Sequence, residues 1–214
     1  MYDEAKKYSS KVSLYTILEE QSRMKLKGEL HIPNRLVSLH ETEARPIKKG
    51  KSFPDCEFGT TNQMGFNRQG FMVTCEILIG APKDKVLYSG TMQKYKNKME
   101  GLLPYSITDG NYRSKKNQDF AEKEGVSHIF FGKTKDVDSE EQEKCKSARS
   151  ATEGLIAVAK NLRGFNKSLY RGLKGDQIWA GLAQAAFNLK KFLLLFQNEQ
   201  IGEEPLITLG LIPK

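Results

Sequence analysis

Apolar residues recur along this chain with two spacings, one typical of helices and one typical of strands. Recurrence every three or four residues predicts helices over residues 3–25, 91–99, 114–125, 139–163 and 176–197. Alternation predicts two longer strands, 57–66 and 71–80, joined by a hairpin loop at 67–70. Shorter apolar runs predict strands at 35–39, 102–108 and 126–131. This mixture of helices and strands predicts an α/β fold with a mixed sheet.

The last two helices are predicted to pack on the core through apolar stripes. In the helix around 149–163 the seam consists of Ala148, Ala151, Leu155, Val158, Ala159 and Leu162. In the last helix it consists of Ile178, Leu182, Ala185, Ala186, Leu189, Phe192 and Phe196. Each set falls on one side of a helix at about 100° per residue.

The opposite side of the first of these helices carries charge. Arg149, Glu153 and Lys160 are spaced by four and seven residues, and Arg163 and Arg171 follow. Between residues 144 and 174 the chain has eight Lys or Arg and one acid, Glu153. An isolated acid among bases has two interpretations: a salt-bridge anchor, or a ligand for a divalent cation while the bases hold phosphates.

A second stretch carries an acid at the end of a strand. The run 102–108 leads into Asp109 and Gly110, and a helix capped by Ser114 follows. Ligands of open α/β sheets collect beyond the carboxyl ends of strands, and glycine permits a sharp turn there. Asp109 is therefore placed for chemistry, although a turn Asp that binds its own backbone explains the residue equally well.

Together the two stretches resemble the catalytic half of insertion-sequence transposases, which have a ribonuclease H-like core and an Asp-Asp-Glu triad. The family's strand-end Asp-x-Gly-Tyr resembles Asp109-Gly-Asn-Tyr112, with one extra residue before the Tyr. Its helix signature of Tyr, Arg, Glu and Lys is matched by Arg149, Glu153 and Lys160, but Lys146 stands at the Tyr position. Tyr170-Arg171-Gly172 is also typical of these enzymes, and the resemblance covers residues 35–197.

The resemblance implies DNA transposase activity, in which metal-dependent cleavage and strand transfer occur at transposon ends. Asp109 and Glu153 would be catalytic and would hold Mg²⁺ or Mn²⁺. Lys160 would hold a phosphate of the transposon end, Arg149 would support the Glu, and Arg163 and Arg171 would contact DNA. The implied partner is double-stranded DNA, both transposon ends and target, with a homodimer as one arrangement of the complex.

The first acid of the triad has no clear counterpart. In the family it ends a strand upstream of 35–39, and the nearby acids Glu41, Glu43 and Asp55 lie in a linker. We therefore expect a C-terminal fragment whose ribonuclease H-like sheet lacks its first core strand and exposes unpaired edges. The expected parts are an N-terminal helical segment (1–34), a partial catalytic domain (35–197) and a tail (198–214).

Two functions follow from that expectation. The first is a transposase domain that is active only with the missing part, and the second is an inactive remnant that binds DNA. A nuclease of the same core fold is a third interpretation. The Arg-Glu-Lys spacing favours a transposase over a nuclease.

Composition limits the partners and the compartment that are compatible with this sequence. The net charge of +8 and the pI of about 9.2 indicate an anionic partner, although a basic protein without one has the same composition. Three widely spaced cysteines have no metal-ligand spacing and indicate a reducing compartment. The longest apolar run, 192–196, is too short to cross a bilayer. We expect no membrane partner and a cytoplasmic protein that associates with the nucleoid when it binds DNA.

Overall fold

The computed structural model describes residues 2–48, 56–99, 103–132 and 139–197 of the chain. Its strands are β1 (Arg45–Lys48), β2 (Cys56–Phe66), β3 (Met72–Ile79), β4 (Tyr105–Thr108) and β5 (His128–Phe131). Its helices are α1 (Tyr2–Leu26), α2 (Asp84–Met99), the 3₁₀ turn η1 (Gly110–Tyr112), α3 (Lys115–Lys123), α4 (Ser139–Leu162) and α5 (Gly172–Gln197).

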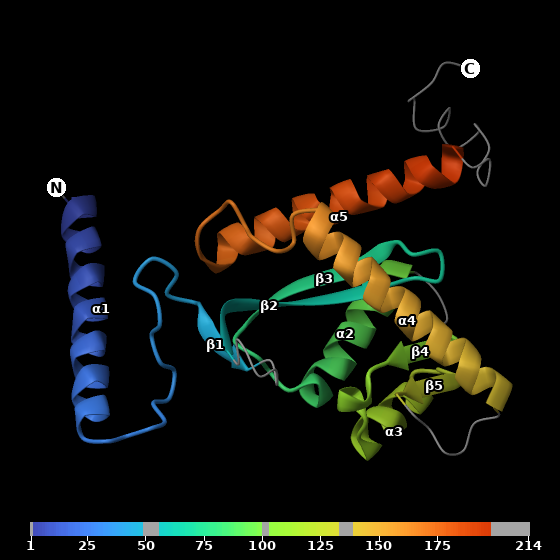
Figure 1. The fold of residues 1–214 in the computed structure, drawn as a ribbon, viewed down its shortest axis with the longest axis horizontal. Coiled ribbons are helices and arrows are strands. Elements are labelled where there is room, and N and C mark those ends of the chain that lie inside the picture. The colour runs from blue at the N-terminus through green and yellow to red at the C-terminus, as the bar shows by residue number, and fades with distance from the viewer. Residues whose placement is uncertain (1, 49–55, 100–102, 133–138, 198–214) are drawn as a thin grey trace.

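These strands form two separate sheets, with helices packed on both (Figure 1). Strands β1, β2 and β3 are antiparallel, and β4 pairs with β5 in parallel. The predicted β2–β3 hairpin is confirmed: the Asn67 N–H donates to the Phe71 carbonyl at 2.9 Å, and Gly70 has a φ of 86°. Within the described ranges no strand joins the two sheets. The fold is mixed α/β, as predicted.

One hydrophobic core lies between the three-stranded sheet and helices α4 and α5. Its buried members are Met72, Ala159, Phe165, Ala180, Ala183 and Phe187. Met72 is at the centre of this core, and α5 also binds its backbone. Gln184 and Asn188 side chains donate to the Met72 carbonyl, and the Asn188 side-chain oxygen accepts from its N–H. These bonds fix the rotation of α5 over β3.

This arrangement contradicts the predicted apolar stripe of α5. Ile178, Leu182 and Leu189 are each more than half exposed, and Ala185 and Ala186 are exposed as well. The contacting face carries small alanines and amides instead, because these let the helix approach the β3 backbone closely enough for hydrogen bonds. The predicted stripe is therefore wrong as far as Leu189, whereas its last two members, Phe192 and Phe196, are half-buried.

The predicted seam of α4 is also only partly correct. Ala159 is fully buried and Leu155 packs beside it, whereas Ala148, Ala151 and Val158 are exposed and Leu162 is 65% exposed. The buried positions instead follow a narrow line from Cys145 to Ala159, since α4 contacts the body along one edge only.

A second core lies among α2, α3 and β5, and it supports the end of β4. Its buried members are Tyr88, Met92, Ala121, Val126 and Phe131. The Tyr88 ring meets the Phe131 ring edge-on at 5.2 Å. The buried Tyr88 and Ser106 hydroxyls are 2.8 Å apart and hydrogen-bonded, which connects α2 to β4.

Several element boundaries differ from the prediction. Residues 35–39 form no strand; instead 45–48 pairs with β2 as β1. Helix α2 begins at Asp84 rather than at residue 91, and α5 begins at Gly172 rather than at 176. Helix α1 is present as predicted and stands apart from the body (Figure 1). The predicted tail, 198–214, lies outside the described residues.

None of the helices in the described ranges has the length and apolar character needed to cross a membrane.

Candidate functional site

Asp109 lies directly after β4, where the sequence predicts it. It has an extended backbone and caps the turn η1, and its Oδ1 accepts from the Gly110 N–H at 2.6 Å. The predicted alternative, a turn Asp that binds its own backbone, therefore describes one of its contacts. Its side chain is 60% exposed, so the carboxylate also faces solvent and can take a further partner.

Close packing at two glycines fixes this turn against the end of β5. Gly132 follows β5 with a φ of 67°, and a Cβ built on it would lie 3.0 Å from Gly110 N and Gly110 Cα. The Gly132 N–H donates to the Thr108 carbonyl at 3.0 Å. The Arg113 guanidinium donates to the Phe131 carbonyl at 2.9 Å on the other side of the turn. The two strand ends therefore hold the Asp109 backbone in place.

Hydrogen bonds also connect the turn to α2 and β2. The buried Asn117 side chain donates to the Tyr112 carbonyl and to the Lys85 carbonyl of α2. The Tyr112 hydroxyl accepts from the Gln63 amide of β2 at 3.1 Å. Gln63 in turn accepts from Thr91 of α2 at 2.8 Å. This polar chain spans the region between the two sheets.

Helix α4 brings Glu153 to the same place. It packs against β4 through its N-terminal half, where Cys145 is buried. One turn earlier, Glu141 Oε1 lies 2.6 Å from His128 Nδ1 of β5, and the His128 ring stacks on Tyr105. These contacts direct the following turns, with Arg149 and Glu153, across the carboxyl end of β4.

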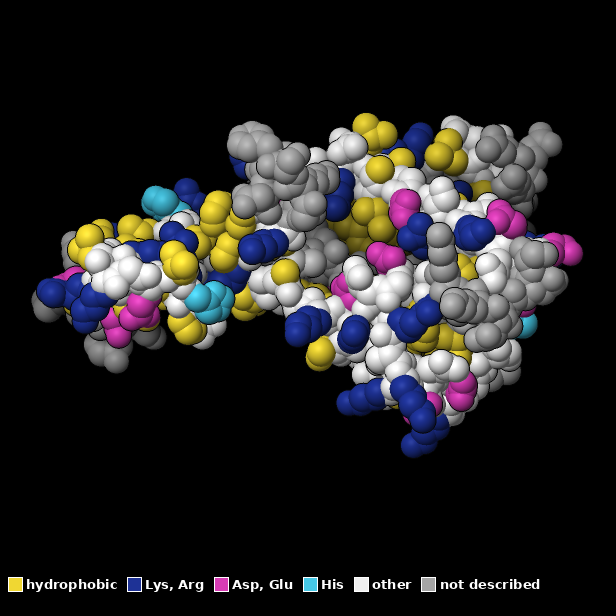
Figure 2. All heavy atoms as spheres, turned by 60° about the horizontal axis from the view of Figure 1, so that its bottom comes forward, with side chains coloured by type: hydrophobic (Ala, Val, Ile, Leu, Met, Phe, Trp, Pro, Cys, Tyr) yellow, Lys and Arg dark blue, Asp and Glu magenta, His cyan; other side chains and the backbone are white. Residues whose placement is uncertain are grey.

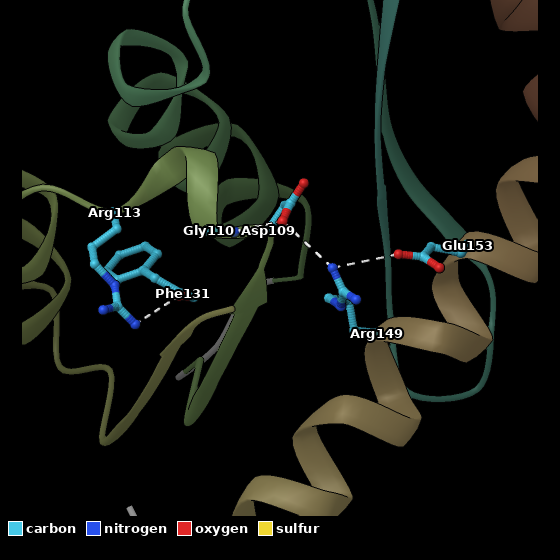
Figure 3. Close-up of polar contacts among 6 residues, drawn as sticks. All are labelled: Asp109, Gly110, Arg113, Phe131, Arg149 and Glu153. Atoms are coloured by element: carbon cyan, nitrogen blue, oxygen red, sulfur yellow. Dashed lines mark hydrogen bonds and ion pairs between the residues drawn. The ribbon is translucent and has the colours of Figure 1, made fainter. Parts of the chain in front are cut away.

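Arg149 connects the two predicted acids (Figure 3). Its Nη1 atom is 3.4 Å from Asp109 Oδ1 and 3.5 Å from Glu153 Oε1. The two carboxylate oxygens are thus no more than about 6.9 Å apart, the sum of those two distances. The structure therefore brings together three sequence-predicted residues from two elements that are forty residues apart.

Asp84, the first residue of α2, is an acid near this site that the sequence reasoning missed. Burial raises its pKa, the charge of Asp109 raises it further, and a hydrogen bond from the Asn111 side chain lowers it. Burial also raises the pKa of Tyr112, and the charges of Asp84 and Asp109 raise it further. The sequence signal was present, since an acid after Pro82 at a helix start is typical of a first turn. It was overlooked because the helix was predicted to begin seven residues later.

Lys160 does not contact the carboxylates; it lines a neighbouring cleft of about 790 Å³. Figure 2 shows a hollow with an apolar floor and with acidic and basic side chains around it. The charged lining residues are Glu41, Glu43, Lys48, Glu57, Asp84, Lys160, Lys167 and Asp176. The cleft connects Lys160 on α4 with Asp84 at the start of α2.

The other predicted DNA contacts are more scattered. Arg163 is half-buried and donates to the Leu162 carbonyl at 2.9 Å, and Arg171 is exposed just before α5. Of the linker acids, Glu41 accepts from the Gly172 N–H at 2.8 Å and so caps α5. Glu43 lines the cleft, and Asp55 lies outside the described residues.

The donor atoms at the end of β4 have the right chemistry for Mg²⁺, which prefers carboxylate and water oxygens. Asp109 and Glu153 converge there and Asp84 lies near Asp109, but the described part of the chain contains no group of three or more His, Cys, Asp and Glu placed to hold a metal. The oxygen donors of this site therefore suit a hard divalent ion, but there are too few carboxylates to complete its coordination.

Comparison with known protein families provides independent information on this region. Residues 112–193 match the family of transposase DDE domains. The match to the transposase DDE domain covers under half of the 214 residues; it includes Arg149, Glu153 and Lys160 and begins three residues after Asp109. No curated protein and no solved structure matches the chain.

The match supports the prediction of a DDE transposase, and the Arg-Glu-Lys motif on which that prediction partly rests lies within the matched residues. Transposases act on DNA, so DNA is the partner that the family implies. DDE domains generally use divalent metal, which is consistent with the oxygen donors at the end of β4. Helix α4, which carries Arg149 and Glu153, lies wholly within the matched region.

Proposed function

We propose that this chain is the catalytic part of a metal-dependent DNA transposase that cleaves phosphodiesters and transfers strands at transposon ends. Asp109 and Glu153 are the proposed catalytic acids and metal ligands. Arg149, Lys160, Arg163 and Arg171 are the proposed DNA contacts. The observation that supports this most strongly is the convergence of Asp109 and Glu153 on Arg149, of which Arg149 and Glu153 lie in the region that matches a transposase DDE domain and Asp109 lies three residues before it.

Each residue has a distinct part in this proposal. Asp109 and Glu153 present oxygens that hold Mg²⁺ or Mn²⁺. When bound, the ion supplies Lewis-acid activation of the phosphodiester and of the attacking oxygen. Lys160 is exposed seven residues beyond Glu153 on α4, from where it can position the phosphate of the bound strand.

A third acid completes the proposed site. Two carboxylates hold a divalent ion weakly, and in-line displacement needs both the attacking and the leaving oxygen stabilised. We propose that this acid lies on a strand that joins the two sheets into one ribonuclease H-like sheet. The separation of the described strands into two sheets supports this proposal.

The DNA contacts can be tested by binding as a function of salt. The bases between residues 144 and 174 should give sequence-tolerant binding that weakens steeply as salt rises, because each phosphate contact releases counterions. Lys160→Ala should lower the salt slope by about one contact and leave the fold intact, since the side chain is exposed. Lys123→Ala, which removes an exposed lysine from α3, is the matched control. Equal effects of the two variants would argue against a phosphate at Lys160.

Activity is tested by a cleavage assay with Mn²⁺ on DNA that carries transposon ends. We expect no cleavage by the 214 residues alone and recovery when an upstream strand ending in Asp is supplied. That gain should vanish with Asp109→Ala or Glu153→Ala. DNA binding without cleavage in every condition would instead identify a remnant that only binds DNA. Cleavage by the chain alone that Glu153→Ala abolishes would mean that an acid of the chain itself serves as the third acid, either Asp84 near Asp109 or one of Glu41, Glu43 and Asp55.

A further inference from the structure

The Arg149 side chain lies where a shared ion of the two acids would lie. Figure 3 shows it directed from α4 toward the turn after β4, between the Asp109 and Glu153 carboxylates. One nitrogen, Nη1, is close to both, at 3.4 and 3.5 Å. A positive charge placed between two carboxylates stabilises their proximity in the way a metal ion does.

We propose that Arg149 is an internal counter-ion of this site and that its binding and the binding of a divalent ion at Asp109 and Glu153 exclude each other. The inference rests on the proposed function, because it assigns a regulatory role to a residue of the same site. It differs from a role in which Arg149 merely supports Glu153, since in that case Arg149 would help the metal to bind.

Geometry supports the exclusion. Asp109 and Glu153 would hold a Mg²⁺ ion through oxygens at about 2.0–2.1 Å, a much shorter distance than either carboxylate now has to Arg149. Arg149 Nη1 now lies between the two carboxylates, 3.4 Å from Asp109 Oδ1. The guanidinium and the ion also repel each other at such a separation. One of the two must leave before the other can bind.

Arg149 is held loosely enough to leave. Its two distances exceed the 2.7–2.9 Å that is typical of strong charge-assisted hydrogen bonds. Its side chain is 41% exposed, and those of Asp109 and Glu153 are 60% and 63% exposed, so water screens both pairs. Exchange between the guanidinium and a hydrated divalent ion therefore does not require unfolding of α4.

The acidic surroundings favour a counter-ion in the absence of metal. Burial and the nearby charge of Asp109 both raise the pKa of Asp84, so a third carboxyl group lies next to the two acids that Arg149 bridges. A cation between these carboxyl groups lowers their mutual repulsion. The freed guanidinium can then reach a DNA phosphate, so metal and DNA should strengthen each other's binding by the same factor.

Direct measurement of Mn²⁺ binding tests the inference without any reaction. Free Mn²⁺ is followed by electron paramagnetic resonance for the full chain and for Arg149→Gln. We expect Arg149→Gln to bind Mn²⁺ about tenfold more tightly, since a unit positive charge is removed from beside a divalent ion. Lys146→Gln is the matched control, because it removes the same charge one turn earlier from a side chain that pairs with Glu143 instead. It should change the affinity by less than about twofold.

A second variant tests whether the charge of Arg149, and not the shape of its side chain, controls Mn²⁺ binding. Arg149→Lys keeps the cation, so its Mn²⁺ affinity should stay near that of the unaltered chain. Each protein is also measured with Asp109→Asn added, which should remove the binding in every background. Unfolding midpoints should agree within a few degrees, because Arg149 is at the surface.

The outcomes distinguish the inference from the proposed function. If the unaltered chain binds Mn²⁺ through Asp109 and Arg149→Gln binds it no more tightly, the counter-ion inference is wrong and the metal site stands. Weaker binding by Arg149→Gln would show that Arg149 supports Glu153. If no protein binds Mn²⁺ at millimolar concentration, both the metal site and the inference are refuted.

Discussion

Gly132→Ala should destabilise the protein and displace the candidate site. Gly132 has a φ of 67°, a conformation that costs an L-residue roughly 1–2 kcal/mol. Its new Cβ would also lie 3.0 Å from the N and Cα atoms of Gly110. Both are backbone atoms held by a turn, so they cannot rotate away as a side chain would. Overpacking of this kind costs roughly 1–3 kcal/mol, which gives a total of roughly 2–5 kcal/mol.

Gly125→Ala provides the matched control. Gly125 has a similar φ of 83° after α3, but nothing lies within 4 Å of its added Cβ. It should therefore lose only the conformational part, roughly 1–2 kcal/mol. The reduced entropy of the unfolded chain offsets both substitutions equally, by about 0.4–1 kcal/mol. The difference between the two variants isolates the contact between Gly132 and Gly110.

Two assays read this difference. Denaturant unfolding gives the free energy of unfolding, in which Gly132→Ala should lose at least about 1 kcal/mol more than Gly125→Ala. The affinity for Mn²⁺ reports the effect on Asp109. If the new Cβ displaces Gly110, the neighbouring Asp109 carboxylate should move with it and the affinity should fall. Equal losses of stability, with equal Mn²⁺ affinities, would show that the two strand ends do not position the carboxylate.

Three further predictions concern single side chains. The pKa of Asp84 in the folded state is raised above the ordinary value of 3.8. The protein therefore loses stability as the pH rises through this folded-state pKa, because the ionised carboxylate is less stable in the folded chain. Asp84→Asn should raise the melting temperature at neutral pH but not below pH 3.8. A thermal scan without a gain at neutral pH would contradict the raised pKa of Asp84, which results from its burial and from the nearby charge of Asp109. Burial raises the pKa of Cys75 to about 11, so iodoacetamide at pH 8 should label it far more slowly in the folded than in the denatured chain, as mass spectrometry can measure. Tyr88→Phe should cost about 1–3 kcal/mol in denaturant unfolding, because the buried Ser106 hydroxyl loses its partner, and a change of a few tenths would be evidence against that bond.

The sequence predicted the local structure of the site well. Asp109 follows a short apolar strand, and Ser114 caps the next helix by accepting from the Asn117 N–H at 3.1 Å. Both depend on neighbouring residues, whose turn and capping preferences can be read directly. The fourfold spacing of Arg149 and Glu153 likewise placed them on one side of a helix.

Long-range packing was harder to predict. Which side of α5 is buried depends on hydrogen bonds to the Met72 backbone from Gln184 and Asn188, residues 112 and 116 positions away. No local pattern encodes that contact, and larger apolar residues on the other side gave a stronger but misleading signal. Asp84 was missed for the same reason, because its proximity to Asp109 arises only when α2 packs beside η1.

Metal-directed cutting of the backbone tests the central claim most directly, that Asp109 and Glu153 hold one divalent ion. Fe²⁺ is substituted for Mg²⁺ in the full chain, ascorbate and peroxide generate hydroxyl radicals at the bound ion, and mass spectrometry maps the cuts. We predict cuts in two stretches, around residue 109 and around residue 153, that excess Mg²⁺ suppresses and Asp109→Asn abolishes. Cuts at only one of these stretches, or cuts elsewhere that Asp109→Asn leaves unchanged, would contradict a shared metal site.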